Sequence, residues 1–388
     1  MSKKGAQQGP AFIDLAAQYR QIGDRIGRAI DAVLQHGQYI LGPEVTELER
    51  RLAEFCGARH CITCANGTDA LLLVLMAEGI GPGDAVFVPA FTFVATAEVV
   101  VLAGATPVFV DVRPDSFNLD TESLEAAIGE AKSLGLRPRC VIPVDLYGQP
   151  ADYPAIGRVA EANSLVVLAD AAQSFGASLN GQKVGTLASY AATSFYPSKP
   201  LGGYGDGGAI FTDHDAKAKL LRAIRCHGRH PDGSECGQVG LNSRLDAIQA
   251  AILLEKLLVF PQEIVARQAS AERYGEGLGA EVQVPKLTAG ATSVWAQYTI
   301  VTERRDELAK ACREAGVPTA IHYASPLHAL PAYQQFPMAP GGLPQAEWLA
   351  KHVISLPMHA YLVDETQDLV ISAIRGVIRS LKAGVAAE

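Results

Sequence analysis

The sequence AVFVPAFTFVATAEVVVLAGATPVFV, residues 85–110, decides the fold class of this chain. It is long enough to cross a bilayer, but two prolines, a glutamate and a glycine interrupt it: Pro89, Pro107, Glu98 and Gly104. The interruptions leave a short β-branched run, a helical piece and a second short run, which is typical of a buried strand, a helix and a strand. We therefore expect no membrane span, because a lipid-crossing helix needs about 20 consecutive apolar residues.

The same alternation of short apolar runs and helical stretches continues on both sides of this segment, in CITC, CVIPVD and VVLAD. Strands that are separated by helices pair in parallel, with crossover helices on the two faces of the sheet. The runs at 190–195 and 207–212 have no helix-length spacer between them, so we expect these two to pair antiparallel. The sequence thus predicts an α/β fold with a mostly parallel sheet.

Helices flank the predicted sheet at both ends. Two helices separated by a glycine-bounded turn, HGQYILGP at residues 36–43, come before it. A long amphipathic helix follows it over residues 244–260, and Pro261 is expected to end that helix. We place the end of a large domain, residues 10–260, at this point and assign residues 261–388 to a smaller α+β domain.

The composition excludes several classes of protein. Hydrophobic residues make up 48% of the 388 residues and charged residues 19%, which indicates a compact globular chain and not a disordered one. The net charge of −8 argues against a general nucleic-acid surface, which needs a basic field. The start, MSKKGAQQGP, lacks the apolar core of a signal peptide, so we expect a cytoplasmic protein.

Seven cysteines, an odd number, do not suggest a framework of disulfides. Cys61 and Cys64 have C-x-x-C spacing, but neither a second such pair nor a well-spaced pair of histidines completes a tetrahedral metal site. We interpret both as small buried residues and expect no metal.

The strongest local signal for chemistry is ATSFYPSKPLGGYGDGG, residues 192–208, in which a strand is followed by Lys199 and then by five glycines within seven residues. Glycines let the backbone approach a flat ligand, or they form the tight turn into a following strand. Lys199 could form a Schiff base with a carbonyl compound if burial lowers the pKa of its amine. A glycine-rich hairpin with a solvated lysine is the alternative, and it stays open at this point.

Two further segments could contact a ligand at the same edge of the sheet. In VVLADAAQSFGA, Asp170 closes an apolar strand, where open α/β sheets bind ligands and where an acid could pair with a protonated ring nitrogen. In CANGTDALLL, Gly67 and Thr68 begin a helix, which is the outline of a phosphate site. Plain helix capping, by Asp170 in the first segment and by Asn66 or Thr68 in the second, is the alternative.

An imine-forming lysine, an acid for a ring nitrogen and a helix N-terminus for a phosphate are together the groups that bind pyridoxal 5′-phosphate (PLP). The chain resembles the DegT/DnrJ/EryC1/StrS family of nucleotide-sugar aminotransferases over residues 12–359. The matching segments are GQYILGPEVTELE, NGTDAL, PAFTFVAT, PVFVDV, DAAQSFGA, TSFYPSKPLGGYGDGG and NSRLDAIQAAIL. The resemblance implies a fold type I PLP-dependent enzyme, with a mostly parallel seven-stranded sheet in its large domain.

The resemblance also implies how the cofactor, PLP or its amino form PMP, is bound. Lys199 resembles the lysine that binds the cofactor covalently, and Asp170 resembles the partner of the pyridine nitrogen. Gln173 would lie near the phenolic oxygen, and Phe93 would stack on the ring. The expected phosphate ligands are Gly67, Thr68 and Ser194, with Asn242 from the neighbouring subunit of a homodimer whose active site is shared.

The reaction that the resemblance implies is a ping-pong transamination from glutamate to a keto-sugar linked to UDP or dTDP, with 3-keto-sugars as the first expectation and amino-sugar or polysaccharide biosynthesis as the context. His322 and Tyr323 resemble the pair that contacts the sugar. Arg229 belongs to the basic segment RAIRCHGRHPDG, which could bind a diphosphate, although a solvated helix end explains the same segment. Arg244 could pair with a sugar carboxylate.

Several alternatives stay open. Arg244 could instead form an ion pair with Asp246 or Glu255. Ala324 and Ser325 stand where close relatives have a proline and a branched aliphatic residue, which leaves the shape of the pocket undecided. The sugar carbon that receives the amino group could be C4 and not C3. A non-catalytic regulator with the PLP-enzyme fold is also possible. A PMP-dependent dehydratase would have a histidine in place of Lys199, so the lysine argues against that class.

Overall fold

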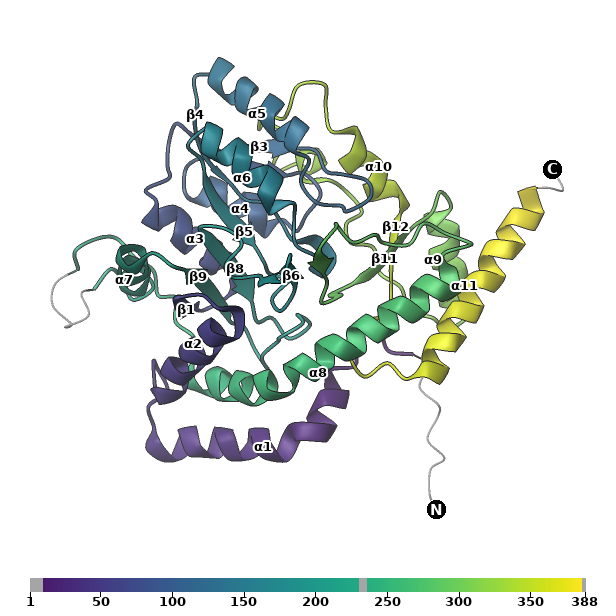
Figure 1. Ribbon diagram of the computed structural model, residues 1–388, viewed down its shortest axis with the longest axis horizontal. Helices are drawn as coiled ribbons and strands as arrows, with labels where there is room; N and C mark the ends of the chain where they lie inside the picture. Colours follow the sequence, from purple (N-terminus) through teal and green to yellow (C-terminus); the bar gives the residue numbers. More distant parts are fainter. Residues whose placement is uncertain (1–9, 230–235, 386–388) are drawn as a thin grey trace.

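The computed structural model of the protein describes residues 10–229 and 236–385 (Figure 1). It begins with two helices, α1 (Leu15–His36) and α2 (Pro43–Cys56), which both contact the long helix α8 (Ala247–Leu278). The turn predicted between two helices therefore lies where expected. The centre of the α1–α8 contact is apolar, with Ile22, Ile26 and Ile252 buried in it.

A seven-stranded sheet forms the centre of the molecule, in the order β1-β9-β8-β5-β4-β2-β3. Only β9 runs against its neighbours, since it pairs antiparallel with both β1 and β8. The predicted mostly parallel sheet and the antiparallel pair are both confirmed. The strands are β1 (His60–Cys64), β2 (Asp84–Pro89), β3 (Thr106–Val110), β4 (Arg137–Val141), β5 (Val166–Asp170), β8 (Tyr190–Ser194) and β9 (Gly208–Thr212).

Helices connect these strands and bury the sheet. The strand, helix and strand predicted within residues 85–110 are β2, α4 and β3, and every residue of β2 is buried. Burial along the whole strand is expected where helices cover both faces of a parallel sheet. The connecting helices are α3 (Gly67–Ala77), α4 (Ala95–Leu102), α5 (Thr121–Ser133) and α6 (Tyr153–Ala162), and α7 (Asp215–Ile224) follows β9, the last strand of this sheet.

The C-terminal part has a second, smaller apolar core, which includes Tyr298, Ile300, Ile354 and Leu356. An antiparallel pair of strands, helices α9 and α11, and the end of α8 surround it (Figure 1). A small sheet of two-residue strands lies where the two parts of the chain meet. The elements are β6 (Ser178–Leu179), β7 (Gln182–Lys183), β10 (Ala291–Thr292), β11 (Tyr298–Val301), α9 (Arg305–Glu314), α10 (Pro344–His352), β12 (Val353–Leu356) and α11 (Asp364–Val385).

Helix α8 differs from the prediction, because it does not end before Pro261 but continues to Leu278. A proline inside a helix removes one backbone donor and costs about 3 kcal/mol. Here Phe260 is buried in the large core and Tyr274 in the small one, so burial at both ends outweighs that cost. The domain boundary at residue 260 stays a prediction, because the helix is continuous there and residues 327–353 return to the large core.

Membrane spans, metal sites and cysteines were also considered in the sequence analysis. No helix of the described ranges is long and apolar enough to span a bilayer. Within the same ranges, no group of three or more His, Cys, Asp or Glu side chains is placed to hold a metal ion. All seven cysteines are unpaired, and Cys61 and Cys64 are buried in β1, as we interpreted them.

Two arginines of the basic segment that we considered for diphosphate binding are used inside the fold. Arg225 is buried and pairs with Glu49, and its Nη1 also donates to the carbonyl oxygen of Thr63 at 2.7 Å. Arg222 lies 3.5 Å from the same carboxylate. These two residues therefore tie the end of α7 to α2 and β1. The interpretation as a solvated helix end is wrong for the buried Arg225, whose guanidinium is also not free to bind a diphosphate.

Removing Arg225 should destabilise the protein, because Glu49 and the Thr63 carbonyl would lose their main donor in a poorly solvated place. We expect Arg225→Met to lower the free energy of unfolding by about 3 kcal/mol in urea titrations. The control is Arg51→Met, which removes an exposed arginine paired with Glu47. This variant should change the free energy of unfolding by less than about 1 kcal/mol. Equal losses in the two variants would contradict the structural role of Arg225.

Candidate active site

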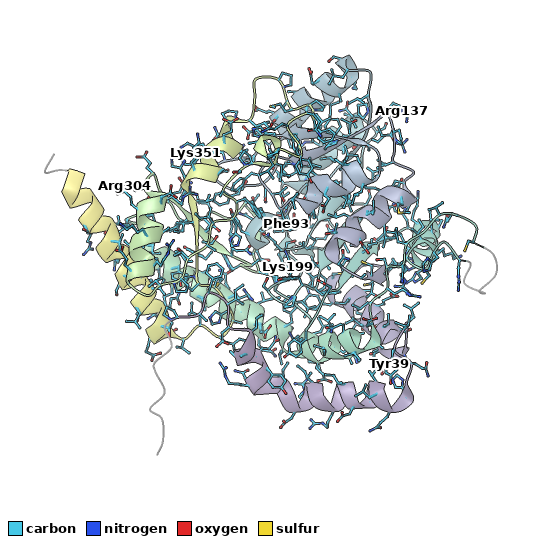
Figure 2. The ribbon with its side chains drawn as sticks, turned by 180° about the vertical axis from the view of Figure 1, so that it is seen from behind. Tyr39, Phe93, Arg137, Lys199, Arg304 and Lys351 are labelled. Carbon is cyan, nitrogen blue, oxygen red and sulfur yellow. The ribbon has the colours of Figure 1, made fainter. Side chains whose placement is uncertain are left out.

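Lys199 lies in the loop that follows β8, and its backbone N–H donates to the carbonyl oxygen of Tyr196 at 2.8 Å. Figure 2 shows Lys199 toward the middle of the molecule, with Phe93 nearby in the view. The ammonium group forms no hydrogen bond and no ion pair within residues 10–229 and 236–385. Burial lowers the pKa of Lys199, and the carboxylate of Asp170 only partly opposes this shift. Lys199 can thus supply a neutral, nucleophilic amine more readily than an exposed lysine.

Asp170 is the last residue of β5 and is buried. Its Oδ2 accepts a hydrogen bond from Thr96 Oγ1 at 2.8 Å, and its Oδ1 accepts one from the N–H of Ala172 at 3.2 Å. Burial nevertheless raises the pKa of Asp170, because these two donors and the charge of Lys199 compensate it only in part. A cationic group placed beside this carboxylate would complete its neutralisation.

The N-terminus of α3 faces the end of β8. Asn66 caps the helix, since its Oδ1 accepts from the N–H of Asp69 at 2.8 Å. The amides of Gly67 and Thr68 have no acceptor in the part of the chain that the structure describes. A Cβ atom at residue 67 would lie 2.7 Å from Ser194 Cβ, so only glycine allows the helix to come this close to the strand. The free amides of Gly67 and Thr68 and the hydroxyl of Ser194 therefore meet where a phosphate could bind.

Gln173 is buried, and the structure fixes which way its amide points. Its Oε1 accepts a hydrogen bond from the N–H of Tyr147 at 2.7 Å, which leaves Nε2 to donate toward Tyr323 Oη at 3.4 Å. The same Tyr147 donates through its hydroxyl to the carbonyl oxygen of His322. Gln173 therefore presents an N–H group to the site, and Tyr147 connects it with the segment of the His322–Tyr323 pair.

Tyr147 was not predicted to matter. Its φ of 61° lies in the left-handed region, which is unusual for a residue other than glycine, and its ring packs edge-on against Phe117 at 5.2 Å between ring centroids. An unusual backbone conformation held by two hydrogen bonds is typical of residues that position a functional site. The LYG segment has no pattern that would reveal this, because both of its partners are more than 20 residues away in the sequence.

The two sugar-contact candidates lie beside the same site. The Nδ1 of His322 is 3.1 Å from Ser355 Oγ. Burial, and next the positive charge of Lys199, lower the pKa of His322. Phe93 is 53% exposed, and its ring centroid lies 6.2 Å from that of Tyr323. An aromatic ring with one open face is available to stack on a flat ligand.

Helix α8 supports the loop that carries Lys199. Gln249 Oε1 accepts from the N–H of Tyr204 at 2.8 Å, and Lys256 Nζ donates to the carbonyl oxygen of Gly202 at 2.6 Å. A Cβ atom at Gly203 would lie 2.9 Å from Gln249 Oε1, so this glycine is needed for a close approach to the helix. The glycine-rich segment does connect the antiparallel strands β8 and β9, but its lysine is not a solvated one, because burial lowers the pKa of Lys199.

Of the remaining candidates, Asn242 and Arg229 lie on the surface of the chain and Arg244 is half-buried. Both surface residues are held through their backbones: Asn242 bridges Cys226, and Arg229 bridges Cys236 and donates its N–H to the carbonyl oxygen of Cys226 at 3.3 Å. Arg244 has no ion pair in the described residues, and Glu255 pairs with Arg25 instead, at 2.7 Å. The alternative of an ion pair between Arg244 and the start of α8 is therefore wrong. His230 of the basic segment lies outside the described residues.

These groups fit a phosphorylated aromatic aldehyde. A buried amine can bind its carbonyl carbon, a carboxylate without a full counter-charge can hold a ring N–H⁺, and two free amides can hold its phosphate. An open aromatic ring and an amide donor complete the surroundings of a flat ring. On an α/β sheet of this order, the site defines a fold type I PLP-dependent aminotransferase.

Comparison with known proteins identifies the family. The sequence profile of the DegT/DnrJ/EryC1/StrS aminotransferase family matches residues 20–375. A UDP-2-acetamido-2-deoxy-3-oxo-D-glucuronate aminotransferase of Pseudomonas aeruginosa is 50% identical over 364 residues, which cover 94% of this chain and 99% of the relative. The chain belongs to the DegT/DnrJ/EryC1/StrS aminotransferase family, as its motifs indicated.

Solved structures agree with this assignment. A DegT/DnrJ/EryC1/StrS aminotransferase from Brucella abortus has a TM-score of 0.93 and 51% identity, covering 94% of this chain and 98% of that one. NtdA from Bacillus subtilis, solved with bound PMP, has a TM-score of 0.88 and 28% identity, covering 97% of this chain and 87% of that one. The predicted fold class and the predicted cofactor, PLP or PMP, are thereby confirmed.

Tyr147 is predicted to position the His322–Tyr323 segment and not to bind the cofactor. Tyr147→Phe removes the hydrogen bond to the His322 carbonyl but keeps the backbone N–H that orients Gln173. We expect the KM of the amino acceptor to rise about tenfold, which corresponds to about 1.4 kcal/mol for one lost hydrogen bond, with unchanged cofactor retention. Tyr333→Phe is the control, because Tyr333 is also buried but its hydroxyl has no hydrogen bond in the described ranges. Loss of cofactor in Tyr147→Phe would count against this division of roles.

Proposed function

We propose that this aminotransferase moves an amino group from glutamate to a keto-sugar that is linked to a nucleoside diphosphate, with a UDP-linked 3-keto-sugar as the first candidate. One observation carries the proposal: the unpaired amine of Lys199 and the buried carboxylate of Asp170 share one site with the free amides of α3. The Pseudomonas aeruginosa relative, which is named for a UDP-linked 3-oxo-sugar, supports the substrate class.

Lys199 and Asp170 are the proposed catalytic residues. When bound, PLP supplies an aldehyde carbon for the amino group and a pyridinium ring that draws electrons from the carbon atom losing its proton. Lys199 holds the cofactor in the resting enzyme and, once its amine is released, moves the proton. Asp170 keeps the proton on the ring nitrogen, since its buried carboxylate favours a neighbouring cation.

The other cofactor ligands are proposed from their places around this pair. Gly67, Thr68 and Ser194 bind the phosphate through two amides and a hydroxyl. Gln173 donates its Nε2–H to the phenolic oxygen, because its Oε1 is already occupied by the Tyr147 N–H. Phe93 covers one face of the ring.

His322 and Tyr323 are the proposed sugar contacts, because their segment is held beside Gln173 and their rings lie close to Phe12, Phe91 and Phe93. Arg229 and Arg244 are proposed as the cationic contacts of the substrate's diphosphate or of a sugar carboxylate. Both are free of ion pairs among the described residues, so their charges remain available to an anionic ligand.

A homodimer with a shared active site explains several exposed apolar side chains. The turn between α1 and α2 exposes Tyr39 at 45%, Ile40 at 50% and Leu41 at 37%, and Figure 2 shows Tyr39 at the edge of the molecule. Near Asn242, Val239 is 84% exposed. A second subunit that covers these groups would bring Asn242 to the phosphate of its partner. A cytoplasmic location is part of the same proposal.

The lysine assignment is tested by chemistry at one side chain. Borohydride reduction of the purified holoenzyme should leave a pyridoxyl group on the peptide that contains Lys199, as read by mass spectrometry. Lys199→Ala should lose this label and all turnover while keeping the circular dichroism and melting temperature of the parent. Lys183→Ala is the control, because Lys183 lies on β7, where its Nζ donates to the carbonyl oxygen of Phe55. Turnover in Lys199→Ala would contradict the proposed mechanism.

The substrate class is tested with a panel of UDP- and dTDP-linked 3-keto- and 4-keto-sugars, each assayed with glutamate. We expect the UDP-linked 3-keto-sugars to have kcat/KM values at least about tenfold above the rest. A preference for 4-keto-sugars would revise the ring position and leave the transamination intact. If glutamate does not remove the absorption band of the bound cofactor, a non-catalytic regulator would be favoured.

The shared site is tested with hybrid dimers. Asn242→Ala should weaken cofactor retention, and mixing it with Lys199→Ala under subunit-exchange conditions should restore part of the activity. The reason is that a hybrid contains one site built from the two unaltered residues. No recovery, together with proof that subunits have exchanged, would show that each site is complete within one chain.

A further inference from the structure

A buried acid that the proposed mechanism does not use lies next to the cofactor site. Asp145 follows β4 and is fully buried. Its backbone N–H donates to the carbonyl oxygen of Asp170 at 3.1 Å, and the N–H of Asp170 donates to the carbonyl oxygen of Pro143 at 2.8 Å. Asp145 therefore lies beside Asp170 at the same edge of the sheet. Within residues 10–229 and 236–385, it takes part in no ion pair.

The carboxylate of Asp145 joins the loop after β4 to the turn after β5. Its Oδ2 accepts a hydrogen bond from Ser174 Oγ at 2.7 Å, in that turn. Its Oδ1 accepts from the N–H of Ala151 at 2.9 Å and from the hydroxyl of Tyr153 at 2.7 Å. An ionised carboxylate only accepts, so it can take all three donors at once. One side chain thus closes the loop at residues 145–151 and fastens it to Ser174.

The loop that Asp145 closes has an unfavourable backbone conformation. Tyr147 and Gly148 both have a positive φ, of 61° and 110°. A residue with a side chain keeps such a conformation only where the surrounding contacts hold it. A Cβ atom at Gly148 would lie 2.8 Å from the backbone nitrogen of Trp295, so the loop also packs closely against the C-terminal part of the chain. The bonds to Asp145 are among the contacts that hold this conformation.

The position of this loop decides how the Gln173 amide is turned. The N–H of Tyr147 donates to Gln173 Oε1 at 2.7 Å, and the next residue, Ser174, donates to Asp145. The two ends of an amide differ in kind, because the nitrogen donates and the oxygen only accepts. The Tyr147 N–H therefore selects the orientation in which the Gln173 N–H faces a ligand. Asp145 holds both partners of that bond, one through the loop and the other through Ser174.

The electrostatic surroundings of Asp145 favour a cation nearby. Burial raises the pKa of Asp145 to about 7, its three donors oppose the rise only in part, and the charge of Asp170 adds to it. Burial also raises the pKa of Tyr153, which keeps this hydroxyl a donor to the carboxylate. A ring N–H⁺ bound at Asp170 would reduce the repulsion between the two acids. Cofactor binding and the ionised form of Asp145 thus support each other.

We propose that Asp145 is a positioning residue of the cofactor site: it holds the turn of Gln173 against the loop of Tyr147 and so keeps the Gln173 N–H directed at the phenolic oxygen of the cofactor. This inference rests on the proposed role of Gln173. A donor at the phenolic oxygen stabilises the negative charge there, so it favours loss of a proton from the bound cofactor. It therefore lowers the pH midpoint of the accompanying change in cofactor absorption.

Two variants that each remove one hydroxyl from the same carboxylate test this role in the holoenzyme. Ser174→Ala cuts the bond to the turn of Gln173, whereas Tyr153→Phe, the matched control, cuts a bond at the other oxygen. Both should lower the melting temperature by about 2 °C, as expected for one buried hydrogen bond. Only Ser174→Ala should raise the pH midpoint of the cofactor absorption, by about half a pH unit, because only this variant releases Gln173.

The pairing of these variants also removes an ambiguity. Both take one donor away from Asp145, so a change in the ionisation of Asp145 itself affects the two midpoints alike. Ser174→Cys, whose thiol is only a weak donor, replaces Ser174→Ala if that variant does not fold. Equal shifts of the midpoint in the Ser174 and Tyr153 variants, or no shift in either, would overturn the positioning role and leave Asp145 a structural residue.

Gln173→Leu separates this inference from the proposed role on which it rests. It should raise the midpoint more than Ser174→Ala does, since the donor is lost outright. A shift in Gln173→Leu without one in Ser174→Ala would refute the role of Asp145 and keep that of Gln173. An unchanged midpoint in Gln173→Leu would show that Gln173 does not meet the phenolic oxygen, and both roles would be rejected.

Discussion

The site depends on one electrostatic constraint, the burial of an amine and a carboxylate that do not pair with each other. Burial shifts the pKa of Lys199 downward and that of Asp170 upward, so each group is displaced toward its neutral form. A direct ion pair between them would cancel both shifts and leave neither group free for a ligand. The protein avoids this because the Thr96 hydroxyl donates to Asp170, while the Lys199 amine has no partner among the described residues. A cofactor with an aldehyde and a ring cation would give both groups a partner, because the amine can bind the aldehyde carbon and the carboxylate can pair with the cation.

The rest of the fold holds this arrangement from two sides. Parallel strands bring Asp170 and Ser194 to one edge of the sheet, where α3 adds its free amides. From the other side, α8 reaches the Lys199 loop through Gln249 and Lys256. The same helix is buried in both hydrophobic cores, which makes it a rigid link between the lysine loop and the C-terminal part of the chain. Tyr147 provides the second link, from Gln173 to His322.

Much of this could be predicted because the signals are local. The strand, helix and strand of residues 85–110, the antiparallel pair around the glycine-rich loop and the lysine within that loop all follow from neighbouring residues. The predictions were wrong where contacts with residues distant in the sequence determine the structure. Pro261 lies inside α8 because two cores hold the helix, and Arg225 is unavailable for substrate because Glu49, 176 positions away, takes its guanidinium. Asn242 and Arg229 are exposed on one chain and Arg244 is half-buried without an ion pair among the described residues, so their roles depend on a partner or substrate.

The sequence by itself determined the class of fold, because strand periodicity is a property of short segments, and its motifs resembled the family that the comparisons identify. The cofactor groups that this resemblance implies stay a proposal. Only the tertiary structure decided which of these groups stay unpaired, how the Gln173 amide is turned and that Tyr147 connects two parts of the site. The physical reason is that a pKa and the direction of a hydrogen bond depend on burial and on neighbours brought together by folding. Spacing along a chain does not contain that information.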